Sequence, residues 1–260
     1  MGAEQSGSMP NAHGIAEAGS GSCGRQSGLK MSAWVGLFLA LFAGAVFWAF
    51  LRFAHPIFQV PQKYYARFGD PAETYDALRV VQADVDRRNA MVDLGVFGLL
   101  IAGALALGES VARRSVKPLF PVVPIGAGLG CLAGLAGSMA HASTVSSVAM
   151  PGVADTIKVH TVLLGLLGLS VGLALGISAW SIRTGLTATV AGLLAGLFAA
   201  VLYPMAMGLL AMFVPALSTY NFFPTQGVSC VAWIGLTAGL LGLIIPGVAR
   251  SPKPRVTAAA

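Results

Sequence analysis

Six long apolar stretches, separated by shorter polar segments, constrain the fold of this chain more than any other feature. A helix needs about 20 mostly apolar residues to cross the hydrocarbon core of a bilayer. The stretches meet or approach that length, and none shows the alternating polarity of a transmembrane β-strand. We therefore predict an all-α integral membrane protein, a bundle of about six transmembrane helices. The predicted spans are residues 32–53, 90–110, 119–140, 159–182, 186–214 and 228–249.

Composition excludes several other classes of protein. Only 10% of the residues are charged, against about 25% in an average globular domain. That value argues against an ordinary soluble enzyme, a disordered chain and a protein that binds nucleic acid through basic patches. The formal net charge of +6 is typical of a membrane protein with Lys- and Arg-rich cytoplasmic loops. The three cysteines have no metal-like spacing, so we expect neither a disulfide framework nor a zinc site.

The polar segments divide the chain into three regions. Residues 1–31 are rich in Gly and Ser and are expected to form a disordered tail, residues 32–249 form the transmembrane domain, and residues 250–260 form a basic tail. An even number of spans places both termini on one side. The connection that holds Arg113, Arg114 and Lys117 is basic, whereas residues 215–227 carry no charge. By the positive-inside rule we predict cytoplasmic termini in a bacterial inner membrane.

The outer loop, residues 54–89, is the only sizeable polar region between spans. Asp70, Pro71 and Glu73 suit the N-cap, N1 and N3 positions of a helix. We predict a helix from about residue 71 that can continue into the second span. An approximate 3–4 spacing joins apolar residues of this helix into a stripe that would cover the membrane surface, another outer loop or a second subunit. These residues are Tyr75, Leu78, Val81, Val85 and Val92.

Glycines spaced four residues apart recur in the last four spans. Residues at this spacing share one helix face, and a face without side chains lets two helix backbones approach closely. Such faces could support homodimerisation or line a substrate path, but packing within one bundle is the simpler interpretation. We predict a tight hairpin of the third and fourth spans. The glycines are Gly126, Gly130 and Gly134, then Gly168, Gly172 and Gly176, then Gly192 and Gly196, and finally Gly235 and Gly239.

Four tryptophans lie near predicted span ends. Trp34 and Trp48 bracket the first span, Trp180 lies at the end of the fourth, and Trp233 lies near the start of the sixth. This placement predicts that all four belong to the aromatic belts at the membrane–water interfaces.

Two acidic residues lie inside or at the edge of a span. Asp93 and Glu109 are sixteen residues apart, which is about 24 Å along a helix. Ionisable residues within spans are candidates for a transport pathway. The alternative is that both mark the interfacial ends of a short span, with Glu109 paired to Arg113 one turn later. The later spans offer no acidic partner for either carboxylate.

Two histidines and a proline complete the candidate set. His141 ends the third span and His160 begins the fourth, so a hairpin would bring both to the outer interface. Asp155 could cap the fourth span or join them around a transition metal, although interfacial histidines and a helix cap are the simpler interpretation. Pro204 follows Tyr203 within the long fifth span. Proline inside a helix kinks or ends it, and broken helices line the sites of many transporters.

Signature motifs of enzymes are absent. The sequence contains no GxxxxGK[ST], HExxH, CxxC or GxSxG, so we expect a protein without catalytic residues or a cofactor. We carry three hypotheses. The first is a non-enzymatic membrane subunit or scaffold, with a membrane-protein partner or as a homo-oligomer. The second is a small-solute or ion transporter that uses Asp93 and Glu109. The third is a metal-handling protein at His141 and His160.

Overall fold

The computed structural model describes residues 29–65, 71–117, 119–147, 152–179, 181–213, 224 and 227–249. Within these residues the chain is helical apart from its connections, and a backbone hydrogen bond joins Leu29 to Ala249. The elements are α1 (Ala33–Ala54), η1 (Gln62–Tyr64), α2 (Ala72–Arg113), α3 (Leu119–Ser147), α4 (Val153–Ser178), α5 (Ile182–Ala211) and α6 (Gly227–Val248). The expected tails lie outside the described residues, except for residues 29–31.

The all-α membrane fold is confirmed. In the described chain six helices are long and apolar enough to cross a membrane, with mean hydropathy between 1.9 and 2.2 in their most apolar windows. The polypeptide therefore has the architecture of a multi-pass membrane protein, because a helix satisfies all its backbone groups internally where no water is present.

The six helices form two groups. Each helix packs against its neighbours in sequence, and α6 closes the ring by packing on α1. Helices α2, α4 and α6 also contact one another across the middle, whereas α1, α3 and α5 do not. In the most apolar windows of α2, α4 and α6, 56%, 67% and 50% of the residues are buried, against 33%, 28% and 39% in α1, α3 and α5. We call the first group the inner helices and the second the peripheral helices.

Aromatic side chains fill part of the space between the inner helices. The rings of Phe97 on α2 and Trp233 on α6 have centroids 5.5 Å apart, and Phe47 of α1 lies 4.7 Å from Phe97. All three side chains are fully buried. The aromatic-belt prediction is thus wrong for Trp233, which belongs to the core. It agrees with Trp34 and Trp48, which are exposed, while Trp180 lies outside the described residues.

Each inner helix pairs closely with one peripheral helix through small residues. A Cβ added at Gly168 of α4 would lie 2.1 Å from the carbonyl oxygen of Gly192 on α5. At Gly130 of α3 it would lie 2.5 Å from the carbonyl oxygen of Leu94 on α2, and at Gly36 of α1 it would lie 2.4 Å from that of Gly242 on α6. Only glycine permits these approaches, so in this chain the glycine faces serve packing inside one bundle.

The pairing of these glycines differs from the predicted hairpin. Gly126, Gly130 and Gly134 approach the backbone of α2, and Gly168 and Gly172 approach that of α5. The close pairs are therefore α2 with α3 and α4 with α5, while α3 meets α4 through side chains such as Leu163 against Gly137. Gly235 has nothing near it and Gly239 faces only leucine side chains, because α6 uses Gly242 instead. Spacing alone does not show which neighbour a glycine face meets.

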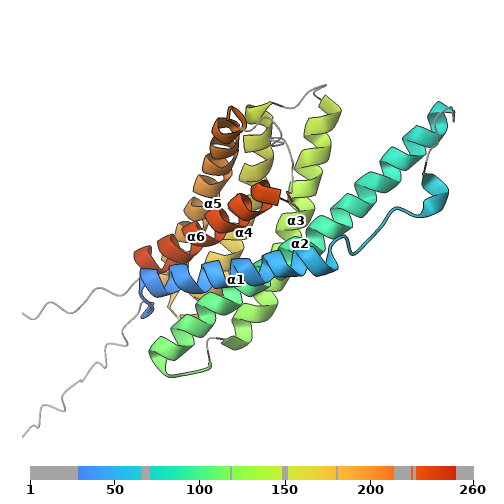
Figure 1. The fold of residues 1–260 in the computed structure, drawn as a ribbon. Helices are drawn as coiled ribbons and strands as arrows, with labels where there is room; N and C mark the ends of the chain where they lie inside the picture. The colour runs from blue at the N-terminus through green and yellow to red at the C-terminus, as the bar shows by residue number, and fades with distance from the viewer. Residues whose placement is uncertain are drawn as a thin grey trace, which may run out of the picture.

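Helix α2 is a single helix of 42 residues that joins the outer loop to the second span. Its first part stands clear of the bundle (Figure 1), and we call residues 72–88 the arm. The helix begins at Ala72 with Pro71 in the cap position and no side-chain cap bond. Asp70, the predicted cap, lies outside the described residues. The arm carries ion pairs of Asp84 with Arg87 and Arg88, at i,i+3 and i,i+4 spacing.

Helix α5 runs without interruption through Pro204 to Ala211. Tyr203 and Pro204 are both buried. Of the alternatives that the sequence left open, an end of the fifth element at Pro204 is therefore excluded. Residue 214, the last of the predicted span, lies outside the described chain.

Candidate functional site

The bundle has two ends that differ in their polar groups. At one end the peripheral helices begin and the inner helices finish, and this end contains Glu109 near the end of α2. We call it the Glu109 end. At the other end the peripheral helices finish and α4 and α6 begin. This end contains Asp93 and His160, and we call it the Asp93 end.

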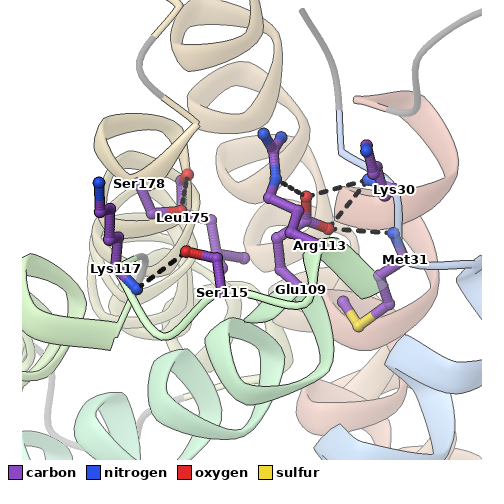
Figure 2. Close-up of polar contacts among 8 residues, drawn as sticks. All are labelled: Lys30, Met31, Glu109, Arg113, Ser115, Lys117, Leu175 and Ser178. Carbon is purple, nitrogen blue, oxygen red and sulfur yellow. Dashed lines mark hydrogen bonds and ion pairs between the residues drawn. The ribbon is translucent and has the colours of Figure 1, made fainter. Parts of the chain in front are cut away.

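At the Glu109 end, one buried carboxylate holds the chain that leads into α1. The backbone N–H of Lys30 donates to both oxygens of Glu109, at 3.0 and 2.9 Å, and that of Met31 donates to Oε2 at 3.0 Å (Figure 2). Arg113, one turn later on α2, donates from Nε to Oε1. A carboxylate offers about four acceptor positions, and these four contacts occupy them. The predicted pair of Glu109 with Arg113 is therefore present.

The segment held by Glu109 is itself packed into the protein. Leu29 and Met31, which the sequence placed in the tail, are buried. The N–H of Leu29 donates to the carbonyl oxygen of Ala249 at 3.0 Å, which ties this segment to the end of α6. A Cβ at Gly108 would lie 2.3 Å from the sulfur of Met31, so the missing side chain makes room for it. The segment before α1 is thus held to α2 by the carboxylate of Glu109 and to the end of α6 by the bond of Leu29.

At the Asp93 end, the second carboxylate has one polar contact within the described chain. Asp93 is fully buried, and its Oδ2 lies 2.9 Å from Nδ1 of His55, which directly follows α1. The approach lacks hydrogen-bond alignment, and neither oxygen of Asp93 has a hydrogen bond within the described chain. We therefore treat the contact as electrostatic.

The amide of Asn89, one turn before Asp93, fixes the loop that follows His55. It accepts from the N–H of Phe58 at 2.8 Å and donates to the carbonyl oxygen of the same residue at 2.9 Å. These two bonds satisfy the backbone of Phe58 as a strand partner would. The side chains of α2 therefore hold both ends of α1, through Glu109 at one end and through Asn89 and Asp93 at the other.

A buried polar pair lies where α4 meets α5. Nδ1 of His160 lies 2.8 Å from the carbonyl oxygen of Thr156. Because a carbonyl oxygen only accepts, Nδ1 carries the hydrogen and the neutral ring presents a lone pair at Nε2. The rings of His160 and Tyr203 have centroids 5.1 Å apart. Nε2 and the hydroxyl of Tyr203 are buried without a hydrogen-bond partner within the described chain.

The structure does not assemble the predicted metal ligands. Asp155 caps α4 by accepting from the N–H of Gly152 at 3.2 Å, and it pairs with Lys158 at 2.9 Å. Across the described ranges, no group of three or more His, Cys, Asp or Glu side chains could hold a metal ion. His141 and His160 do lie at the same end of adjacent helices, as the sequence predicted.

Sequence reasoning missed His55, Asn89 and the chain around Lys30 as partners of the α2 side chains. The signal for His55 was available, because two spans joined by one loop bring the end of the first to the start of the second. His55 and Asp93 occupy those two positions. The backbone donors of residues 30 and 31 carry no signature in the sequence, since any residue supplies an N–H group.

No protein family, curated protein or solved structure matches this chain.

Proposed function

We propose that this protein is a non-enzymatic membrane subunit whose bundle anchors a partner protein through the arm of α2. The observation that carries the proposal is the continuity of α2. One helix runs from the arm into the bundle, where it packs against α1, α3 and α4, so a partner bound to the arm is held by a helix that is part of the bundle.

The use of the buried carboxylates supports an anchoring role. Glu109 is saturated by internal donors and has no acceptor position left for a transported solute. Its contacts, together with those of Asn89 and Asp93, brace α1 against α2. Close glycine contacts do the same for the other helix pairs. A rigid bundle with a protruding helix suits a scaffold better than a transporter that must change shape.

The arm offers apolar side chains for a partner among charged ones. Val80 is 71% exposed and Tyr75 is 43% exposed. Arg87 and Arg88 of the arm are paired with Asp84, so part of their positive charge is compensated within the arm. We propose a neutral-to-apolar protein surface as the partner, located on the non-cytoplasmic side of a bacterial inner membrane, with both termini of this chain in the cytoplasm.

Photo-crosslinking tests the proposal directly. A crosslinking amino acid at Val80 should trap one stoichiometric protein in cells, and the same probe at Phe38, an exposed residue on the apolar surface of α1, should trap lipid only. Val80→Asp should abolish retention of the trapped protein in mild detergent without changing the helical content. Equal retention by this variant would contradict the proposal. A crosslink only between two copies of this chain would replace the partner by a homo-oligomer.

A transporter that uses Asp93 is the second candidate. A specific observation favours it: Asp93, His160 and Tyr203 lie at one end, and each has a buried polar side-chain atom without a hydrogen bond from the described chain. Proteoliposomes should then show proton- or ion-coupled flux that is lost in Asp93→Asn. Wild-type flux in both Asp93→Asn and Glu109→Gln would exclude a carboxylate mechanism.

A further inference from the structure

The turn between α2 and α3 at the Glu109 end carries cations without acidic partners. Arg114 and Lys117 are exposed, and neither forms an ion pair within the described chain. The acidic residues described elsewhere lie on the arm or at the Asp93 end. Glu109, the one described acid at this end, is fully buried and already engaged by Arg113. This end therefore presents uncompensated positive charge.

Backbone hydrogen bonds and the conformation of Arg114 define the turn, and they fix where the side chains of these cations begin. Arg114 adopts the left-handed conformation, with φ 53° and ψ 43°, and ends α2. The N–H of Ser115 then donates to the carbonyl oxygen of Ser110 at 3.0 Å, as in a Schellman motif. The hydroxyl of Ser115 accepts from the N–H of Lys117 at 3.4 Å (Figure 2).

Strongly exposed apolar side chains flank the same cations. Val116 is 64% exposed and lies between Arg114 and Lys117, and Phe120 at the start of α3 is 78% exposed. The start of α5 repeats the combination, with Ile182 86% exposed beside the exposed Arg183. A soluble anion would match the charges but not the apolar neighbours. A molecule that joins a negative headgroup to hydrocarbon chains matches both.

We propose that the α2–α3 turn binds an anionic phospholipid, with the headgroup phosphate on Arg114 and Lys117 and an acyl chain along Phe120. The turn joins the ends of two membrane-spanning helices, so it lies at the depth of the headgroups. Basic residues at this depth attract anionic lipids, and each contributes about fivefold to binding. The site acts at the end of the molecule opposite the arm and is independent of the partner proposed above.

Native mass spectrometry of the detergent-purified protein tests this site. Titration with phosphatidylglycerol should give a saturable one-lipid adduct, and phosphatidylcholine should bind far more weakly. Arg114→Gln with Lys117→Gln should weaken phosphatidylglycerol binding by roughly 25-fold, from about fivefold for each cation. The matched control is Arg87→Gln with Arg88→Gln, two cations of the arm that are paired with Asp84. It should bind phosphatidylglycerol as the wild type does.

A second variant separates the lipid from a free anion. Phe120→Ser should weaken the phosphatidylglycerol adduct while both cations remain. Equal binding of the two lipids, or an unchanged affinity in the Arg114/Lys117 double variant, would overturn the proposal. Displacement of the lipid by inorganic phosphate at the same concentration would also overturn it, because the turn would then be a simple anion site.

Discussion

Asp93 and Glu109 are both fully buried on α2, yet their surroundings differ in one respect. Glu109 receives two backbone N–H groups and a guanidinium, and each donor is positioned by a chain segment that packs against it. Asp93 has one imidazole at 2.9 Å and no hydrogen bond from the described chain. A buried charge is costly unless it is paired and hydrogen-bonded. Glu109 therefore stabilises the fold, whereas Asp93 is a buried carboxylate whose oxygens gain no hydrogen bond from the described chain.

The largest expected effect follows from Glu109→Gln. The amide cannot neutralise Arg113, and its NH₂ group would face backbone donors instead of accepting from them. Removing one partner of a buried pair costs about 3 kcal/mol, so the variant should lose that much in the free energy of unfolding. Denaturation of the protein in mixed detergent micelles measures it.

Two controls decide whether the effect belongs to the pair. Arg114→Gln removes the neighbouring unpaired cation and should change the unfolding free energy by less than about 0.5 kcal/mol. Glu109→Gln with Arg113→Gln should recover part of the loss, because the uncompensated charge is gone. If the losses in unfolding free energy of the two single variants simply add in the double variant, Arg113 and Glu109 do not stabilise the fold through each other.

Asp93→Asn should have a smaller effect, because only the contact with His55 is lost. We expect a loss of about 1 kcal/mol at neutral pH, typical of one polar contact. The same denaturation assay applies, with Asn89→Ala as a reference that removes two hydrogen bonds to Phe58. A loss as large as that of Glu109→Gln would contradict the contrast between the two carboxylates.

The sequence predicted the class of fold because apolar length is a property of each segment alone. Hydropathy located all six helices, and the helical spacing of Glu109 and Arg113 predicted their pair. The sequence could not show that Gly126 faces α2 and not α4, since a glycine face fits any close neighbour. It placed Trp233 in a belt because a position near a span end does not reveal whether a helix is inner or peripheral. Contacts between distant segments, such as Glu109 with Lys30, form only when all six helices are packed together, so no local sequence pattern predicts them.

The same limit applied to the candidate site. Histidine positions near span ends predicted that His141 and His160 share one end of the bundle. The partner of His160, however, is Tyr203 on α5, which was singled out only for the proline beside it. No spacing rule connects residues on helices whose packing is unknown.

His160→Leu is the smallest expected effect and tests the Asp93 end without touching a charge pair. Leucine removes the hydrogen bond from Nδ1 to the carbonyl oxygen of Thr156, which contributes about 1 kcal/mol. It also removes Nε2, a buried polar atom without a hydrogen bond within the described chain, and the relief of that unsatisfied atom offsets the loss. We expect the unfolding free energy to change by less than about 1 kcal/mol.

Leu163→Ala, a fully buried residue one turn away on α4, is the reference for a packing defect and should cost about 2–5 kcal/mol. If His160→Leu costs as much as that reference, the imidazole has a partner that stabilises the folded protein, and the Asp93 end holds a bound ligand or water network that matches the saturation seen at Glu109.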